Sequence, residues 1–182
     1  MNGRTFKRKK KSKLKEYFSD FLKDKYNKIF LGIFIFAIAL RLYFLITSIH
    51  QSVWWDAADY LTEAKILAGK LNIVYDFTAR RTFLLPLLWA GLLNLGFGEI
   101  SFRILEFLFS IATVPLAYFI GKSIFDKKIG LMFSFFFSVF WMHIFYSNRL
   151  MTEIPSLTLL LFSVFFFWDA YHNKKEKSYI WF

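Results

Sequence analysis

Long apolar stretches alternate with short polar and basic segments along most of the chain. Residues 29–49, 102–125 and 129–147 each form a mainly apolar run, and a helix needs about 20 such residues to cross a bilayer. A fourth run, 155–168, is slightly shorter. We therefore predict an all-α, polytopic integral membrane protein with four complete transmembrane helices.

A shorter apolar run covers residues 83–97 and would form a helix of roughly 22 Å. If this run spanned the membrane, the lysine-rich segments near 127–128 and 174–177 would lie opposite the basic N-terminus. Positive residues favour the cytoplasmic side. We therefore predict that 83–97 is a helix in the outer interface, and that the chain after it re-enters the membrane.

The composition excludes several classes of protein. Hydrophobic residues make up 57% of the chain, and there is no cysteine, which argues against a soluble globule, a disordered chain and a disulfide-stapled module. Residues 1–28 contain many of the basic residues and run directly into an apolar helix. This pattern favours a basic cytoplasmic tail beside anionic lipid over a nucleic-acid-binding arm. We expect residues 29–182 to form the membrane region, with an outer loop at 50–101.

Two acidic sites follow outward-running helices in this layout. Asp56 comes after Trp54 and Trp55, and Glu153 lies between the third and fourth spans. A carboxylate at the membrane boundary beside aromatic rings suits general-base work, because partial desolvation raises its pKa. A structural interpretation also stands, in which Asp56 only caps the following helix and the tryptophans belong to an interfacial belt.

Charged residues inside the apolar runs have structural interpretations too. Arg41 is expected to pair with Glu106 or with a lipid phosphate. Arg103 and Glu106 lie on one helical face and are candidates for a mutual ion pair, while Arg149 either holds Glu153 ionised or binds a phosphate. The histidines show no metal-binding spacing, and there is no nucleotide-binding or serine-hydrolase motif.

Five short motifs occur in one order along the chain, each weak by itself. They are Asp56-Tyr60-Ala64, the Arg-x-x-x-x-Pro-Leu-Leu run at 81–88, the Gly-Glu-x-x-x-Arg run at 98–105, the Gly-Lys-x-x-Phe turn at 121–125, and the Ser-x-Arg-x-x-x-Glu-x-Pro run at 147–155. Together they resemble the start of GT-C polytopic glycosyltransferases, above all the protein O-mannosyltransferase and lipid A aminoarabinose transferase group.

This resemblance implies transfer of a sugar, with inversion, from a polyprenyl-phosphate carrier to a hydroxyl of a protein, lipid or glycan acceptor at the outer face. Asp56 would be the general base, and Glu153 a second acid that orients the acceptor or an ion. Arg149 or the arginine pair at 80–81 would stabilise the phosphate. The residues expected to bind substrate are Asp59, Tyr60, Arg80, Arg81 and Arg149. No metal-binding residue is assigned; a divalent metal stays open as a cofactor, because the relatives differ.

The chain departs from the family pattern in three ways. Ala57 stands where many relatives have a second acid, so Asp59 is an alternative base, and Glu153 stands where aspartate is common. The chain also ends at 178–182 in what looks like the first turn of a fifth span, which indicates a truncated form, inactive in isolation. Two other functions stay open: a non-catalytic membrane subunit and a transporter fragment.

Overall fold

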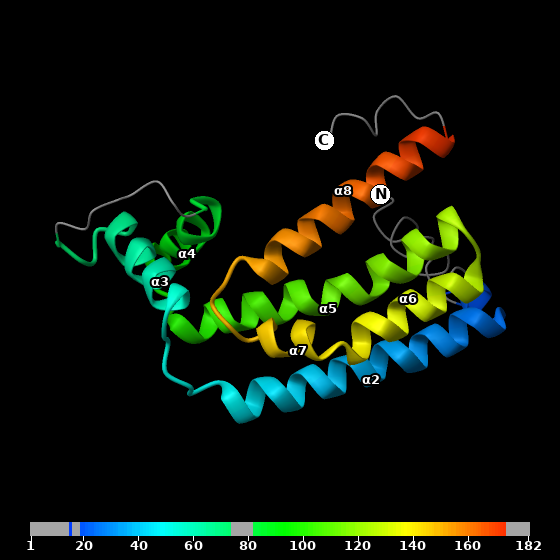
Figure 1. Ribbon diagram of the computed structural model, residues 1–182, viewed down its shortest axis with the longest axis horizontal. Helices are drawn as coiled ribbons and strands as arrows, with labels where there is room; N and C mark the ends of the chain where they lie inside the picture. Colours follow the sequence, from blue (N-terminus) through cyan, green and yellow to red (C-terminus); the bar gives the residue numbers. More distant parts are fainter. Residues whose placement is uncertain (1–14, 16–18, 74–81, 174–182) are drawn as a thin grey trace, which may run out of the picture.

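The structure is a computed structural model that describes residues 15, 19–73 and 82–173. Across these residues the chain is all-helical and has no strand (Figure 1), which confirms the predicted all-α class. Arg80, Arg81 and the predicted start of a fifth span lie outside the described residues. The helices are α2 (Lys25–Ser48), α3 (Asp56–Leu67), α4 (Leu84–Asn94), α5 (Glu99–Ile124), α6 (Lys127–Val139), α7 (Trp141–Tyr146) and α8 (Glu153–Asn173).

Three of the described helices are long and apolar enough to cross a membrane: α2, α5 and α8. They correspond to the predicted spans that begin at 29, 102 and 155. Helices α2, α5 and α6 pack against one another, and α8 packs on α5 (Figure 1). The predicted count of four complete transmembrane helices is therefore supported for three of them.

The expected continuous span at 129–147 is instead two helices, α6 and α7, separated by a break at Phe140. This residue has an extended backbone, with φ −62° and ψ 110°. No proline or glycine occurs at the break. At the break, the guanidinium of Arg41 in α2 donates hydrogen bonds to the carbonyls of Phe137 and Ser138. A continuous helix would use those carbonyls for its own next turn.

Helices α3 and α4 form a small cap at one end of the bundle. The run predicted at 83–97 is helical as α4, and the following Gly96 has φ +88°. The Phe97 N–H bonds the Leu92 carbonyl at 3.0 Å, which closes the helix in a Schellman motif. Helix α3 ends in the same way, with Gly69 at φ +69°. The two helices are joined through a buried apolar cluster. Its members are Ala57, Tyr60, Leu61, Ala64, Leu85, Trp89, Leu93, Phe102 and Leu150.

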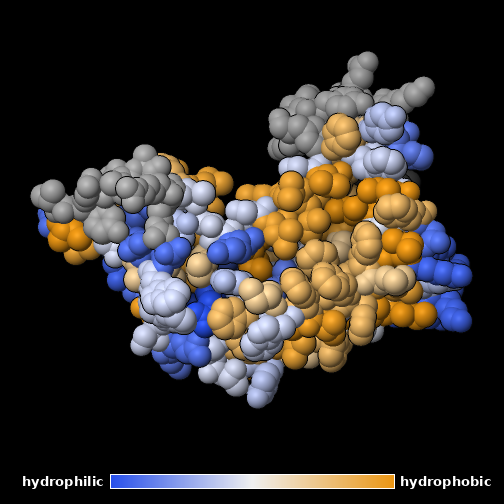
Figure 2. Space-filling model, viewed as in Figure 1, coloured by the Kyte–Doolittle hydropathy of each residue, from blue (hydrophilic) through white to orange (hydrophobic). Residues whose placement is uncertain are grey.

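The opposite end of the bundle carries the tight turn between α5 and α6. Lys127 pairs there with Asp24, whose carboxylate also accepts the Tyr26 N–H at 2.9 Å. The Lys127 ammonium, followed by the Tyr26 N–H, holds the pKa of Asp24 below its ordinary value. Figure 2 shows hydrophobic surface over the middle of the bundle and hydrophilic surface at both ends, as expected of a chain that crosses a bilayer.

Glycine is required where α5 and α6 meet. A Cβ added to Gly130 would lie 2.6 Å from the Tyr118 carbonyl oxygen and 2.9 Å from the Lys122 nitrogen, both backbone atoms. Nothing lies within 4 Å of the corresponding position at Gly91 in α4.

We predict that Gly130→Ala destabilises the protein by about 1–3 kcal/mol, because the two backbones must move apart. The measurement is the unfolding midpoint in detergent. Gly91→Ala serves as the matched control and should keep or raise the midpoint, since alanine favours a helix. Equal midpoints for the two variants would contradict the close α5–α6 contact.

Candidate functional site

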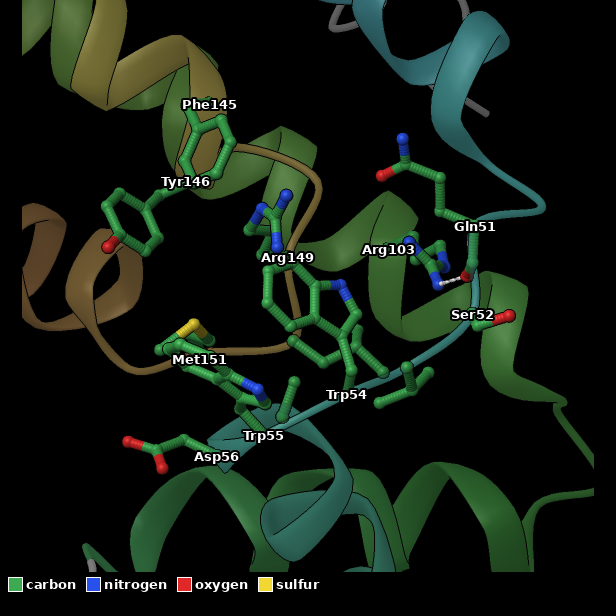
Figure 3. A pocket seen from close by; sticks show the side chains of 13 residues that line it. Gln51, Ser52, Trp54, Trp55, Asp56, Arg103, Phe145, Tyr146, Arg149 and Met151 are labelled. Carbon is green, nitrogen blue, oxygen red and sulfur yellow. Dashed lines mark hydrogen bonds between the residues drawn. The ribbon is translucent and has the colours of Figure 1, made fainter.

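Two segments far apart in the sequence meet at the cap end of the bundle and line a cavity of about 250 Å³. All of residues 51–57 line it, together with five residues between 145 and 151 and Arg103 of α5 (Figure 3). Asp56 and Arg149 therefore share one pocket. Glu153, Asp59 and Tyr60 are not among its lining residues.

Arg103 holds the two lining segments together. Its Nη1 donates to the Asn148 carbonyl at 3.0 Å. Its Nη2 donates to the Gln51 carbonyl at 2.5 Å, the bond drawn in Figure 3. The Asn148 amide in turn donates to Ser48 Oγ at 2.6 Å. The expected pairing of Arg103 with Glu106 is therefore wrong. The reason is that the carbonyls of Gln51 and Asn148 lie outside regular helix and accept from the guanidinium, whose planar fork can bridge both.

Of the two arginines that line the pocket, Arg149 is the one whose hydrogen-bond donors are available to a ligand. Its guanidinium carbon lies 3.9 Å from the ring centroid of Phe145 and 4.7 Å from that of Trp54. These cation–π contacts fix the plane of the group and consume none of its donors. Among the described residues it donates no side-chain hydrogen bond and makes no ion pair with Glu153. Burial lowers the pKa of Arg149 from its ordinary value, opposed by Tyr146, but an arginine stays protonated in proteins.

The backbone is strained directly before Asp56. Trp55 has φ +53°, and it is the one described non-glycine residue with positive φ. Its side chain is 81% exposed, so packing does not explain the conformation. Strain of this kind gathers at functional sites. Asp56 is the first residue of α3, and Trp55 stands before it in the N-cap position without a side-chain cap bond. The interpretation of Asp56 as an N-cap is therefore wrong, because Trp55 occupies the cap position.

The other predicted site residues have different surroundings. Tyr60 is buried in the apolar cluster between α3 and α4, and Asp59 lies on the same helix. Glu153 is the first residue of α8. Arg80 and Arg81 lie outside the described residues.

Glu106 and Arg41 do not pair, contrary to expectation. Both are fully buried, but Arg41 bonds to α5, α6 and α7. Neither carboxyl oxygen of Glu106 has a hydrogen-bond partner in the part of the chain that the structure describes. The described residues also contain no group of three histidine, aspartate or glutamate side chains that is able to hold a metal ion.

Sequence reasoning missed the role of Arg103 and the open donors of Arg149. The one available signal was the Gly-Glu-x-x-x-Arg step at 98–103, which places an arginine at the start of a span. Its partners come from two other segments, and no local pattern reveals them.

The fold and the pocket define an all-helical integral membrane protein with a cationic, aromatic site at one end of its helix bundle. The family model described as dolichyl-phosphate-mannose-protein mannosyltransferase matches residues 80–182, and the chain belongs to this family. Membership confirms the resemblance drawn from the motifs and makes the chain a membrane glycosyltransferase of the mannosyltransferase type. The matched residues include Arg103, Arg149 and Glu153 but begin after Asp56. No curated protein and no solved structure matches the chain.

We predict that Trp55→Gly is more stable than Trp55→Ala by about 1 kcal/mol, because glycine adopts positive φ without steric strain. The measurement is again the unfolding midpoint in detergent. At Ser52, which also lines the pocket but has no positive φ, the usual order should hold, with alanine at least as stable as glycine. The same order at both positions would show that Trp55 is unstrained.

Proposed function

We propose that the pocket between residues 51–57 and 145–151 transfers a sugar from a polyprenyl-phosphate carrier to an acceptor hydroxyl at the outer face of the membrane. The observation that carries this proposal is the shared cavity, which holds a carboxylate, Asp56, and an arginine with open donors, Arg149. Family membership supports a lipid-linked donor and a protein acceptor in general terms.

Arg149 is the proposed site for the phosphate. A guanidinium fork matches two oxygens of a phosphate group, and the rings of Trp54 and Phe145 already hold its plane. Phosphate therefore gains hydrogen bonds without displacing a protein partner. As the sugar leaves, negative charge grows on the phosphate oxygen, and a fixed cation stabilises that charge. Arg80 and Arg81 stay candidates for the same task.

Asp56 is the proposed general base. The acceptor oxygen attacks the anomeric carbon of the sugar, and the bond from that carbon to the phosphate oxygen breaks. The leaving phosphate keeps the bonding electron pair, and the acceptor proton passes to the Asp56 carboxylate. A single displacement of this kind inverts the anomeric centre. The strained Trp55 immediately before Asp56 fixes where α3 begins and thereby fixes the position of the base.

Glu153 and Asp59 keep supporting roles in this proposal. Glu153 follows the pocket segment that ends at Met151, and its proposed role is to orient the acceptor or an ion. Asp59 lies one turn along α3 from Asp56 and remains the alternative base. We also keep the predicted organisation, with a cytoplasmic tail at 1–28 and an outer loop at 50–101.

The transporter alternative gains one observation, because discontinuous helices and buried charges mark transport sites. The break at Phe140 and the buried Arg41 fit that description. However, every N–H donor of Arg41 is already bonded to protein, so it offers no donor to a transported solute. The non-catalytic subunit stays as the rival that the assay below decides.

We predict that Asp56→Asn lowers sugar transfer by at least about 100-fold, the usual contribution of a general base, while membrane insertion is kept. The assay follows mannose moving from polyprenyl-phosphate mannose to a serine-containing peptide, with the full-length protein in liposomes. Asp20→Asn, at the opposite end of the bundle, is the control and should transfer at the wild-type rate. Full turnover by Asp56→Asn together with loss in Asp59→Asn would move the base to Asp59. A full-length wild-type protein that binds the carrier and transfers nothing would favour the non-catalytic subunit.

The sidedness of the pocket has its own test, which the absence of native cysteine makes simple. We expect single cysteines at Ser52 and Thr152 to react with a membrane-impermeant maleimide in intact cells, because both positions border the pocket at the outer face. A cysteine at Lys128, at the other end of α6, should react only after permeabilisation. Labelling of Ser52 and Thr152 on opposite sides would exclude a shared site.

A further inference from the structure

Arg41 is buried within the bundle, and all of its guanidinium donors are used. It lies on α2, about 10 Å before the end of that helix. Nε donates to Ser110 Oγ at 2.8 Å, and Nη2 donates to the Phe137 carbonyl at 2.6 Å. Nη2 also bonds His143 Nδ1 at 3.0 Å, and Nη1 reaches the Ser138 carbonyl at 3.3 Å. The last donor returns to a carbonyl of α2 itself at 3.2 Å. A guanidinium has five N–H donors, so none is left for a lipid phosphate or a substrate.

The bonds of Arg41 also fix the protons of its neighbours. Because a guanidinium only donates, Nδ1 of His143 must accept, and the imidazole proton therefore sits on Nε2. Nε2 then donates to Thr113 Oγ1 at 3.0 Å, and that hydroxyl donates to the Ser110 carbonyl at 2.7 Å. The network joins α2, α5, α6 and α7 with a neutral His143.

Two of the acceptors exist as free carbonyls only because the helix is broken. In a continuous helix the carbonyls of Phe137 and Ser138 would accept the N–H groups of Trp141 and Met142. An exposed carbonyl inside a membrane is costly unless protein satisfies it. Arg41 satisfies both, so it stabilises the broken form over the straight one.

The break determines where the pocket wall stands. Helix α7 has only six residues, and it carries Phe145, which stacks on Arg149. Asn148, two residues after the end of α7, donates a hydrogen bond to Ser48 at the end of α2. A straight α6–α7 helix would rotate and shift this whole segment relative to α2.

We propose that Arg41 is a positioning residue: from inside the membrane it holds the α6–α7 break and thereby places the Phe145–Arg149 wall of the pocket. The ligand-binding part of this inference rests on the proposed function, whereas the helix geometry does not. Arg41 touches no substrate and acts through α7.

The test begins with Arg41→Met and Arg41→Lys in the full chain. Farnesyl phosphate, a short polyprenyl phosphate, is the probe for binding in detergent. A spin-label pair at Lys128 and Met142 reports the geometry across the break. Arg41→Met should weaken binding about tenfold or more and shift the spin-label distance. Arg41→Lys should fall between it and wild type, because one ammonium cannot reach both carbonyls and Ser110. Glu106→Gln is the matched control, because Glu106 is fully buried and its carboxyl oxygens have no hydrogen-bond partner among the described residues, and it should leave both readouts unchanged.

A second substitution separates positioning from a general loss of stability. Trp141 is the first residue of α7, where proline is favoured, and a proline there biases the preceding Phe140 toward the extended conformation it already has. Trp141→Pro should therefore restore the break without Arg41. In the double variant Arg41→Met/Trp141→Pro, binding and the spin-label distance should return toward wild type, although the unfolding midpoint stays low.

The possible results divide cleanly. Wild-type binding by Arg41→Met would overturn the proposal, and so would a loss that Trp141→Pro does not rescue. Weak binding by Trp141→Pro alone would overturn it too, because the break would then not be the feature that matters. If the wild-type chain does not bind farnesyl phosphate, the proposed function fails, and the spin-label distances still decide whether Arg41 holds the break.

Discussion

A guanidinium buried among apolar helices has to find a partner for each of its donors, and this requirement organises the bundle. In the part of the chain that the structure describes, Arg41 bonds no carboxylate, and its charge is solvated by carbonyls, a hydroxyl and an imidazole from α2, α5, α6 and α7. The carbonyls become available only where α6 stops being helical. A buried guanidinium is costly unless its donors are bonded, and free helix carbonyls in the membrane are costly unless a donor reaches them. The hydrogen bonds between Arg41 and the carbonyls at the break offset both costs.

Three arginines of this chain differ in function because they differ in bonding. Arg41 is saturated and acts only on the protein. Arg103 donates hydrogen bonds to the carbonyls of Gln51 and Asn148 and so connects the two segments that line the pocket. Arg149 stacks on Trp54 and Phe145, contacts that leave its donors open. The ligand-binding candidate is therefore recognised by what its side chain does not bond, a property that residue type alone does not reveal.

The pocket lies where the membrane-crossing bundle meets its cap. Below it, α2, α5 and α6 pack closely enough that glycine is required at the far end. Above it, α3 and α4 share one apolar cluster with the beginning of α5. The strained Trp55 joins these two parts. Under the proposed function, a lipid-linked sugar would approach such a site from the bilayer and an acceptor from water.

The sequence by itself determined the helical class, the long apolar helices predicted at 29–49, 102–125 and 155–168, and the short helix after residue 83, because hydropathy and glycine act locally along a chain. The parity of the predicted spans also favoured one side of the membrane for Asp56 and the Arg149 segment, which the structure brings into one pocket. Only the tertiary structure decided the break at Phe140 and the partners of Arg103. The physical reason is that these features depend on hydrogen bonds between residues tens of positions apart. A local run of phenylalanines and serines does not indicate that a distant arginine will donate hydrogen bonds to its carbonyls.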